Sequence, residues 1–374
     1  MRIAVHTGIL LNDNPEGDGY FMKEVLKRII KIYPDHEFII IAGHADAKRF
    51  LFGKNVTVVI TPKPTRYPLL WKLWYDMKIP ALLRKYKADV FIAGDGICSL
   101  ITKTPQCLIV NDLSFLYFPS FIKRSDLFFL KRYTKRFLQR ANSIVTGSEF
   151  VKKDILSRYA IKEEKITVVP NAVKGIFYPL NENEKEKVKR KYTGGKNYFV
   201  YAGAIHPRKN LINLLKAFSV FKKRQQSDWK LVLAGNVDRN YKSFAENLRT
   251  YKYRDDIVMT GRVEEGEIVR LTGSAYAFFY PSFWEGSGVQ VLEAMNSHIP
   301  VVTSFNSSMQ EIAGEAALYI NPAEHKDIAD KMMLLYKDES LRNSLIEKGK
   351  VVAAQYSWEK TADLFWQGIL KALK

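Results

Sequence analysis

The sequence predicts an α/β protein with two doubly wound domains that face a cleft. Three observations lead to this prediction. The chain has 374 residues, and at roughly 100–200 residues per domain two domains are expected. Short apolar runs alternate with helical patterns along the whole chain, which is typical of parallel sheets covered by helices. The alternation starts afresh after a charged stretch at residues 181–196.

The first half contains seven short apolar runs that we predict to be strands. They are rich in Val and Ile, and their polarity does not alternate. Strands of this kind are covered on both faces, so a parallel sheet with helices above and below it is expected. The predicted strands are 2–7, 37–43, 56–60, 88–94, 107–112, 143–148 and 166–171.

The stretch 181–196, NENEKEKVKRKYTGGK, is highly charged and ends in Gly-Gly. It predicts a linker or a solvated helix in front of a second domain. Strand and helix patterns then resume. The predicted strands are 197–204, 230–236, 256–261, 275–282, 299–304 and 317–321, and the predicted helices are 211–224, 264–273, 288–296 and 325–338.

These patterns divide the chain into an N-terminal domain at 1–180, a linker at 181–196, a C-terminal domain at 197–355 and a final segment at 356–374. The final segment contains TADLFWQGILKAL, whose aromatic face needs a partner, and we expect this helix to pack on the N-terminal domain. In doubly wound sheets, ligands bind at the carboxyl ends of the strands. A cleft between two such domains could hold the two substrates of an enzyme.

The composition is that of a folded globular protein, with 47% hydrophobic and 26% charged residues. No apolar run reaches the length of a transmembrane helix, and the first residues lack the pattern of a signal peptide. The two cysteines, Cys98 and Cys107, provide neither a disulfide framework nor metal-ligand spacing. We therefore expect a cytoplasmic protein.

The formal net charge is +19, and it is unevenly distributed. Residues 1–180 hold 29 Lys and Arg against 16 Asp and Glu, so most of the surplus lies in the first half. This asymmetry favours an anionic partner such as nucleic acid, a phospholipid surface or a phosphorylated substrate. Ordinary solubility charge is an equally good explanation.

The stretch FWEGSGVQVLEAMNSHIPVV at 283–302 places two carboxylates in an otherwise apolar segment. A predicted strand runs through a glycine-containing loop into a helix, whose N-terminus attracts phosphate or sugar oxygens. Ser287 is the expected N-cap. Glu285 lies in the loop, and Glu293 lies within the apolar helix, where a buried carboxylate needs a hydrogen-bonding partner. Ligand hydroxyls would serve, and the alternative is that Glu293 caps a neighbouring helix while Glu285 lies in water.

A second strand–turn–helix unit, YAGAIHPRKNLINLL, occupies residues 201–215. Arg208 and Lys209 stand just before the helix, where they would direct two cations at an anion. A solvated pair is disfavoured as an explanation, because cations at a helix start oppose the helix dipole.

The segment EGSGVQVLEAM…PVV resembles the donor-binding signature of retaining glycosyltransferases of family 4, which have the GT-B fold of two Rossmann-like domains. The turn with Arg208 and Lys209 is similar to the family's Gly-x-x-x-x-Arg-Lys-Asn turn. The resemblance implies that Glu285 contacts the donor sugar, that Glu293 contacts the ribose, and that the two cations bind the diphosphate. Many members have an arginine where this chain has Ala204, so Arg208 would have to supply that role.

The resemblance spans nearly the whole chain, and most strongly the part after about residue 140. It implies transfer of a sugar with retention, without a metal or cofactor, because protein cations replace the metal and the leaving phosphate assists the acceptor. The segments NDLSFLYFP and SFWEGSG…SSMQEIAG look most like those of mannosyltransferases that use GDP-mannose. The implied donor-binding residues are Gly203, Arg208, Lys209, Gly235, Gly261, Arg262, Val263, Glu285, Gly286, Ser287, Gly288, Val289 and Glu293.

The N-terminal domain should hold the acceptor. A glycine turn with Gly17, Gly19 and Tyr20 resembles the family's Gly-Gly-x-Gly-x-Tyr loop, although an ordinary strand–helix loop explains it equally well. Asn111 and Asp112 follow a predicted strand where relatives usually have His-Asp. Asn111 does not titrate, so any proton-handling role of that histidine is absent. Asp112 is a candidate for catalysis and acceptor hydroxyls, or the start of an Asx turn.

Residues 121–140, FIKRSDLFFLKRYTKRFLQR, contain seven basic residues and one acidic residue. Apolar positions recur at helical spacing, with cations crowded elsewhere on the helix. Such a helix could lie on an anionic bilayer, or it could pack on the sheet with its polar face in water. We favour membrane contact, given the charge surplus of the first half.

The leading hypothesis is therefore a retaining hexosyltransferase that acts on a glycan or lipid-linked acceptor in the synthesis of a cell-surface polysaccharide such as lipopolysaccharide, in the cytoplasm or peripherally on the inner membrane face. One alternative is a nucleotide-sugar epimerase or phosphorylase with the same fold, for which His206 and His298 would be the candidate acid-base groups. Another is a basic nucleic-acid-binding protein, but no nucleic-acid-binding motif supports it.

Overall fold

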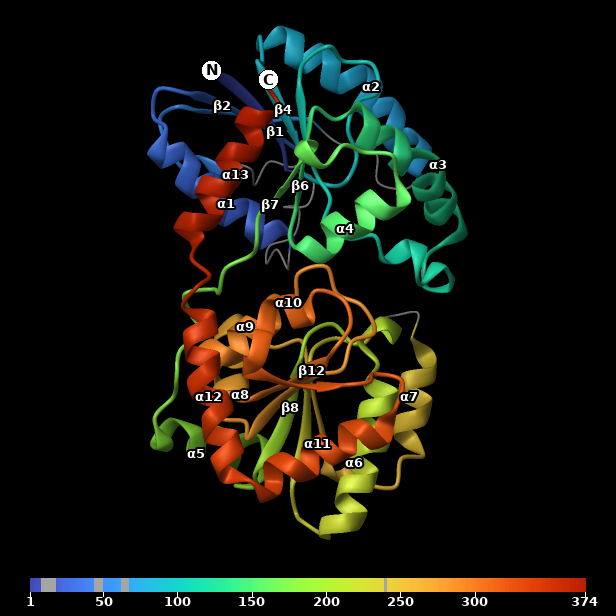
Figure 1. Cartoon of the computed structure of the whole chain (residues 1–374), viewed down its shortest axis with the longest axis vertical. Coiled ribbons are helices and arrows are strands. Elements are labelled where there is room, and N and C mark those ends of the chain that lie inside the picture. Colours follow the sequence, from blue (N-terminus) through green and yellow to red (C-terminus); the bar gives the residue numbers. More distant parts are fainter. Residues whose placement is uncertain (8–17, 44–49, 62–66, 239–240) are drawn as a thin grey trace. The chain divides into compact units, whose positions relative to one another are not determined.

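The structure is a computed structural model that describes residues 1–7, 18–43, 50–61, 67–238 and 241–374. The chain divides into two compact units. The first comprises Met1–Asn171 together with Ser357–Lys374, and the second comprises Ala172–Tyr356. Each unit is a parallel sheet flanked by helices (Figure 1), which confirms the predicted fold class.

The sheet of the first unit has the strand order β3-β2-β1-β4-β5-β6-β7, with every neighbouring pair parallel. The order reverses between β1 and β4, and such a reversal opens a crevice at the carboxyl ends of the two strands. The strands are β1 (Arg2–His6), β2 (Glu37–Ala42), β3 (Val56–Ile60), β4 (Val90–Ala93), β5 (Gln106–Ile109), β6 (Ser143–Thr146) and β7 (Ile166–Val168).

The helices of the first unit are α1 (Asp18–Ile32), α2 (Pro68–Lys85), α3 (Arg124–Arg140), α4 (Glu149–Arg158) and α13 (Trp358–Lys371). Although α13 comes last in sequence, it packs against α1, β6 and β7 (Figure 1). The Ser143 hydroxyl donates to the Gly368 carbonyl at 2.7 Å, and the Phe21 and Phe365 rings meet at 5.9 Å between centroids.

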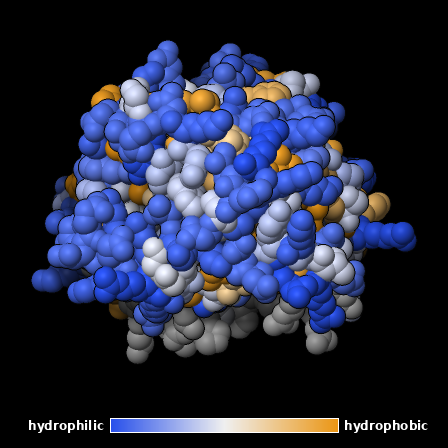
Figure 2. Space-filling view, turned by 90° about the horizontal axis from the view of Figure 1, so that it is seen from below, coloured by the Kyte–Doolittle hydropathy of each residue, from blue (hydrophilic) through white to orange (hydrophobic). Residues whose placement is uncertain are grey.

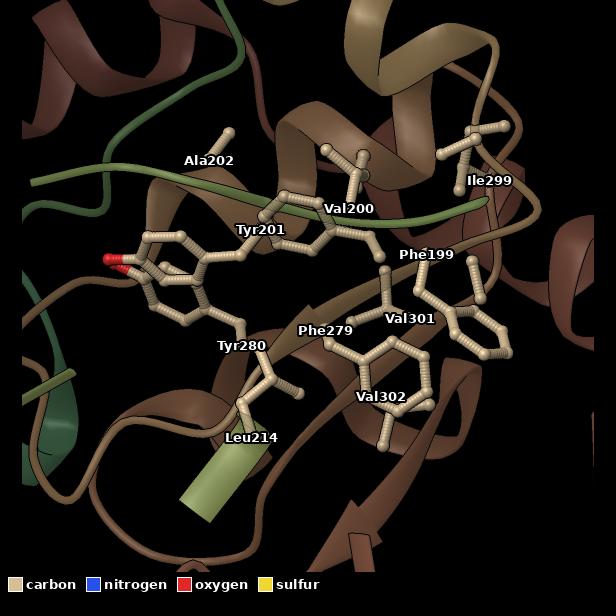
Figure 3. Packing of buried hydrophobic residues seen from close by; sticks show 14 of the residues in the cluster. Phe199, Val200, Tyr201, Ala202, Leu214, Phe279, Tyr280, Ile299, Val301 and Val302 are labelled. Carbon is tan, nitrogen blue, oxygen red and sulfur yellow. The ribbon is translucent and has the colours of Figure 1, made fainter. Parts of the chain in front are cut away.

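The sheet of the second unit has the order β10-β9-β8-β11-β12-β13, and it is also parallel. Its core is built from side chains of the central strands, including Phe199 and Phe279, whose rings meet edge to face (Figure 3). The strands are β8 (Tyr198–Ala202), β9 (Lys230–Ala234), β10 (Ile257–Gly261), β11 (Ala277–Tyr280), β12 (Val301–Ser304) and β13 (Ala317–Ile320).

The predicted linker contains a helix of the second unit, α5, which begins with a capping box between Asn181 and Glu184 and ends at a left-handed Gly194. Each of these features satisfies backbone groups at a helix end. The helices of this unit are α5 (Glu182–Thr193), α6 (Leu211–Gln225), α7 (Lys242–Arg249), α8 (Glu265–Gly273), α9 (Val289–Asn296), α10 (Met309–Ala313), α11 (His325–Lys337) and α12 (Glu339–Ala353).

Two predictions made from composition can be checked within the described part of the chain. Cys98 and Cys107 are buried and free. No described helix is both long enough and apolar enough to span a bilayer.

Candidate functional site

Three of the predicted donor-site glycines stand at the carboxyl ends of adjacent strands. Gly203 follows β8, Gly235 follows β9, and Gly261 ends β10. All three have positive φ. A side chain at Gly235 would place its Cβ only 1.9 Å from the Gly203 carbonyl oxygen. The chain therefore needs glycine where these turns approach each other, and the three glycines lie half-buried at the ligand-binding edge of the sheet.

Lys209 is held at this edge by a short helical turn, Pro207–Lys209, that precedes α6. Its ammonium group is buried, and it donates to Glu285 Oε1 at 2.6 Å and to the Tyr280 hydroxyl at 2.7 Å. The Tyr280 hydroxyl in turn donates to Gln290 Oε1 at 3.2 Å. The turn after β8, strand β11 and the first turn of α9 are thus linked by one chain of hydrogen bonds.

Arg208 lies beside the same carboxylate. Its Nη1 donates to the Trp284 carbonyl at 3.0 Å and is 3.9 Å from Glu285 Oε2. The guanidinium also lies over the Trp284 ring, 5.5 Å from its centroid. These contacts fix the planar cation next to Lys209, so two positive charges share one small region.

Glu285 is buried between these cations. Burial by itself would raise the pKa of its carboxyl, but the charges of Lys209 and Arg208 outweigh burial and hold the pKa below its usual value. The loop is anchored because the Ser308 hydroxyl donates to the Glu285 carbonyl at 2.9 Å. Glu285 is therefore a fixed anion at neutral pH.

The N-cap of α9 is Gly288, so the prediction that Ser287 caps this helix was wrong. Gly288 is in the left-handed conformation, with φ of 50°, and no side-chain cap bond is present. A Cβ at this position would lie 1.9 Å from the Met309 methyl carbon. The backbone N–H groups at the start of α9 accordingly lack a side-chain cap, which favours an oxygen-bearing ligand there.

Glu293 is also buried, with a side chain 8% exposed, but its surroundings differ. No hydrogen bond reaches its carboxylate from the described residues. Burial raises its pKa to about 7, while the charge of Lys174 opposes this shift and that of Glu265 adds to it. Lys174 is itself paired with Glu265 at 2.5 Å. Glu293 thus lacks the partner that a buried carboxylate requires.

Tyr280 is a residue of the candidate site that the sequence did not point to. It is fully buried, its ring stacks on that of Tyr201 with centroids 5.7 Å apart, and the two hydroxyls point the same way (Figure 3). Burial raises its pKa far above the usual value, and the charge of Glu285 adds to this shift. The sequence feature that could have indicated this residue is a tyrosine at the end of the predicted strand that leads into the FWEG loop.

The remaining donor-site candidates stand nearby in the chain, with less specific surroundings. Ala204 is exposed, and its carbonyl accepts from the Tyr201 hydroxyl at 2.8 Å. Arg262 is exposed, whereas Val263 is half-buried and packs against the core. Gly286 and Val289 flank the α9 cap described above.

In the first unit, Gly17 lies outside the described residues. Gly19 and Tyr20 fall in the first turn of α1, and the Tyr20 ring contacts that of Trp358 at 5.7 Å. Asp112 is exposed, and its Oδ1 accepts from the Ser114 backbone N–H at 2.6 Å, which is the Asx-turn alternative. Asn111, beside it, is half-buried.

A polar cluster that the sequence analysis missed lies at the strand-order reversal of the first sheet. The Tyr75 hydroxyl lies 2.7 Å from His6 Nδ1 and also donates to Asp95 Oδ1. His6 and Tyr75 are almost fully buried, whereas the Asp95 side chain is 14% exposed. These residues come from the end of β1, from α2 and from the loop after β4, so only the folded sheet brings them together.

No group of three or more His, Cys, Asp or Glu side chains able to hold a metal ion occurs among the residues with described positions.

Comparison with known proteins identifies related chains. Residues 182–352 match the family model described as "Glycosyl transferases group 1", and residues 22–174 match "Glycosyltransferase Family 4". The O-antigen chain mannosyltransferase RfbU of Salmonella typhimurium is 30% identical over 269 residues, which cover 71% of this chain and 70% of RfbU. The O-antigen chain mannosyltransferase B of Escherichia coli is 25% identical over 359 residues, covering 92% and 93% of the two chains.

Solved structures share the fold. Anabaena HepE, solved in complex with UDP and glucose, superposes with a TM-score of 0.78 at 14% identity and covers 98% of each chain. WaaG, a glycosyltransferase involved in lipopolysaccharide biosynthesis, superposes with a TM-score of 0.72 at 14% identity, covering 96% of this chain and 98% of WaaG.

Proposed function

Since the chain belongs to glycosyltransferase family 4 and is a glycosyltransferase of the GT-B fold, we propose that it transfers mannose from GDP-mannose to a glycan or lipid-linked acceptor during synthesis of a cell-surface polysaccharide. Two relatives named as O-antigen mannosyltransferases support the choice of sugar and pathway. The observation that carries the proposal is the convergence of Arg208, Lys209 and Glu285 at the carboxyl edge of the second sheet.

The donor would bind with its diphosphate at Lys209 and Arg208. These cations would stabilise the charge that develops on the departing phosphate, which is the task a metal performs in other enzymes. Glu285, held as an anion, would accept hydrogen bonds from hydroxyls of the sugar, and Glu293 would accept them from the ribose. The backbone of Ala204, which is exposed, together with the start of α9, would supply N–H donors.

Transfer would proceed with retention at the anomeric carbon. No side chain is assigned as a nucleophile, because the leaving phosphate would take the proton of the acceptor hydroxyl. The acceptor would bind the first unit near Asn111 and Asp112, and the cluster of His6, Tyr75 and Asp95 offers further hydrogen-bonding groups at the edge where doubly wound sheets bind ligands.

We further propose that the enzyme works peripherally on the inner membrane face, where a lipid-linked acceptor would be presented. The surplus of positive charge in residues 1–180 supports this, because the cytoplasmic leaflet is anionic.

The test is a transfer assay on the full chain with a lipid-linked oligosaccharide acceptor and, in turn, GDP-mannose, GDP-glucose or UDP-glucose as the donor. Each reaction is run with and without EDTA, and NMR of the anomeric position identifies the configuration of the product. We expect an α-mannosyl product from GDP-mannose that EDTA does not diminish. Lys209→Gln and Glu285→Gln should each lower turnover by about two or more orders of magnitude, whereas Lys348→Gln, an exposed control in the same unit, should not. An inverted product, strict EDTA sensitivity or normal rates in both site variants would refute the corresponding part of the proposal.

A further inference from the structure

Helix α2 presents an apolar face to solvent. Leu69, Leu70, Leu73 and Met77 are 54%, 42%, 51% and 70% exposed. They recur at spacings of three and four residues, so they lie on one side of the helix. The opposite side, which includes Tyr75 and Ile79, is buried. Four large apolar side chains within nine residues leave this face without a described partner.

This arrangement differs from the scattered hydrophobic residues expected on any protein surface. The face of the molecule in Figure 2 shows that ordinary pattern, because hydrophilic side chains dominate it and the hydrophobic ones appear in small, separated spots. In the second unit, the large exposed apolar side chains are spread over different elements, such as Phe305 after β12, Leu334 on α11 and Val351 on α12.

Helix α3 packs directly beside α2. The Trp71 and Phe129 rings meet at 6.2 Å, and the Lys72 ammonium lies over the Tyr133 ring at 5.7 Å. The apolar stripe of α3, which the sequence analysis assigned to membrane contact, is mainly turned inward: Phe137, for example, is 2% exposed. This stripe is therefore used for packing, and α3 on its own does not offer an apolar surface to a membrane.

The outer face of α3 is basic. Lys131, Arg132, Lys135 and Arg136 are exposed, together with Phe128, which is 66% exposed. Phe128 precedes Arg132 and Lys135 by four and seven residues, so these three side chains share one helical face. The apolar face of α2 and the cationic face of α3 thus belong to two helices that pack beside each other.

We propose that these two faces form one docking surface for an anionic phospholipid bilayer. The apolar side chains of α2 and Phe128 enter the acyl boundary, while the α3 cations contact the headgroups. The pattern favours a bilayer over other anionic partners, since nucleic acid offers phosphates but no apolar layer for Leu73 or Met77. A second copy of this chain fits poorly, because pairing the two apolar faces would bring two sets of α3 cations together.

The docking surface deepens the proposed function. It rests on that function only for its biological purpose, which is to bring the enzyme to a membrane-bound acceptor. Its physical basis lies in residues of the first unit, whereas the donor-site residues belong to the second unit. Vesicle binding and donor binding can therefore succeed or fail independently.

The experiment measures co-sedimentation of the full chain with phosphatidylcholine vesicles that contain either no anionic lipid or about one-third phosphatidylglycerol. One variant is Leu73→Ser with Met77→Ser, and another is Lys131→Gln with Lys135→Gln. The matched controls are Leu334→Ser with Val351→Ser and Lys337→Gln with Lys348→Gln, which change exposed residues of the same types in the second unit. Circular dichroism and a GDP-induced thermal shift report folding and donor binding in each protein.

We expect the full chain to bind the anionic vesicles, and each α2 or α3 variant to bind about tenfold or more weakly, with the GDP-induced shift unchanged. The control variants should bind like the parent. Equal binding of all variants, or equal binding to neutral vesicles, would overturn the proposal. The proposal would also be overturned if the parent formed a dimer and bound no vesicles, and if the variant with Leu73 and Met77 replaced lost that dimer. The apolar face would then join two copies of the chain. Vesicle binding without any GDP response would leave this proposal standing and remove the donor assignment instead.

Discussion

Replacing Glu293 with Gln should stabilise the protein at neutral and higher pH. The carboxyl is buried, receives no hydrogen bond from the described residues, and has a pKa raised from the ordinary 4.5 to about 7 by burial. At about 1.4 kcal/mol per pKa unit, the folded protein at pH 8 loses about 3 kcal/mol by keeping this group ionised. Gln has the same shape and no charge, so the variant avoids this loss.

The direction of the pH dependence follows from proton counts. Between pH 4.5 and 7 the folded protein holds the Glu293 proton more often than the unfolded chain does, so the stability of the parent falls as pH rises through this range and is level above it. The stability difference between Glu293→Gln and the parent should therefore be small at pH 4.5, grow to about 3 kcal/mol near pH 7 and then stay constant.

Differential scanning calorimetry of both proteins from pH 4.5 to 8 would measure this difference. The quantity to compare is the midpoint temperature of the thermal transition in which the second unit unfolds. Glu315→Gln serves as the control, because the Glu315 side chain is 91% exposed. A difference between Glu293→Gln and the parent that does not change with pH, or a variant less stable than the parent at pH 8, would refute the reasoning.

Three further substitutions test the packing and charge of the fold. Gly288→Ala should lower the free energy of unfolding by about 3 kcal/mol, through its left-handed backbone and its clash with Met309, and urea titrations should show a smaller cost for the same change in a Met309→Ala background. Lys209→Met should lower the free energy of unfolding by about 3 kcal/mol, because it removes the hydrogen-bonded cation from the buried Glu285 carboxylate and leaves, among the described cations, only Arg208 at 3.9 Å; adding Glu285→Gln should recover most of the stability but no transfer activity, and failure to recover would contradict the ion-pair assignment. Gly368→Ala should lower the free energy of unfolding by about 1–3 kcal/mol, since its Cβ would lie 2.8 Å from a β6 methyl carbon. An unchanged urea midpoint would show that α13 moves to make room for the methyl group.

The strands were predictable because a buried parallel strand leaves a continuous apolar run in the sequence. Helix α2 was not predicted, and its composition explains why. Its apolar residues lie on all sides, with Leu73 exposed next to a buried Trp74, so no helical period separates an inner from an outer face. Pro80 inside the helix weakens the local signal further. The docking surface that we propose therefore includes a helix that periodicity did not reveal.

The site was predictable to the extent that its chemistry is local. Arg208, Lys209 and Glu285 each stand in a strand–turn–helix unit, where sequence order already places a side chain at the ligand-binding edge. The N-cap at Gly288 was not predictable, because the choice between Ser and Gly depends on a backbone angle and on Met309, which is distant in sequence. The role of Tyr280 likewise depends on partners from two other elements.

Glu285 and Glu293 are eight residues apart, yet the fold places them in opposite electrostatic surroundings. Two cations hold Glu285 ionised, while burial holds Glu293 near half-protonation at neutral pH. Carboxylates whose pKa values are driven apart in this way can serve different roles. If Glu293 accepts hydrogen bonds from the ribose, nucleotide binding favours its ionised form, because hydroxyl donors stabilise a carboxylate directly. A diphosphate without ribose has the opposite effect, since its negative charge favours the protonated form.

Isothermal titration calorimetry of the full chain near pH 7, in two buffers of different ionisation enthalpy, separates these effects. Relative to Glu293→Gln, the parent should release additional protons on binding GDP and take up additional protons on binding pyrophosphate. This difference isolates Glu293, because the ligand phosphates titrate alike in both proteins, and in Glu293→Gln the affinity for GDP should fall more than that for pyrophosphate. If the parent and Glu293→Gln exchange the same number of protons with GDP, Glu293 does not receive the ribose. Its raised pKa would then reflect burial alone, and the donor would have to lie over other residues of the second unit.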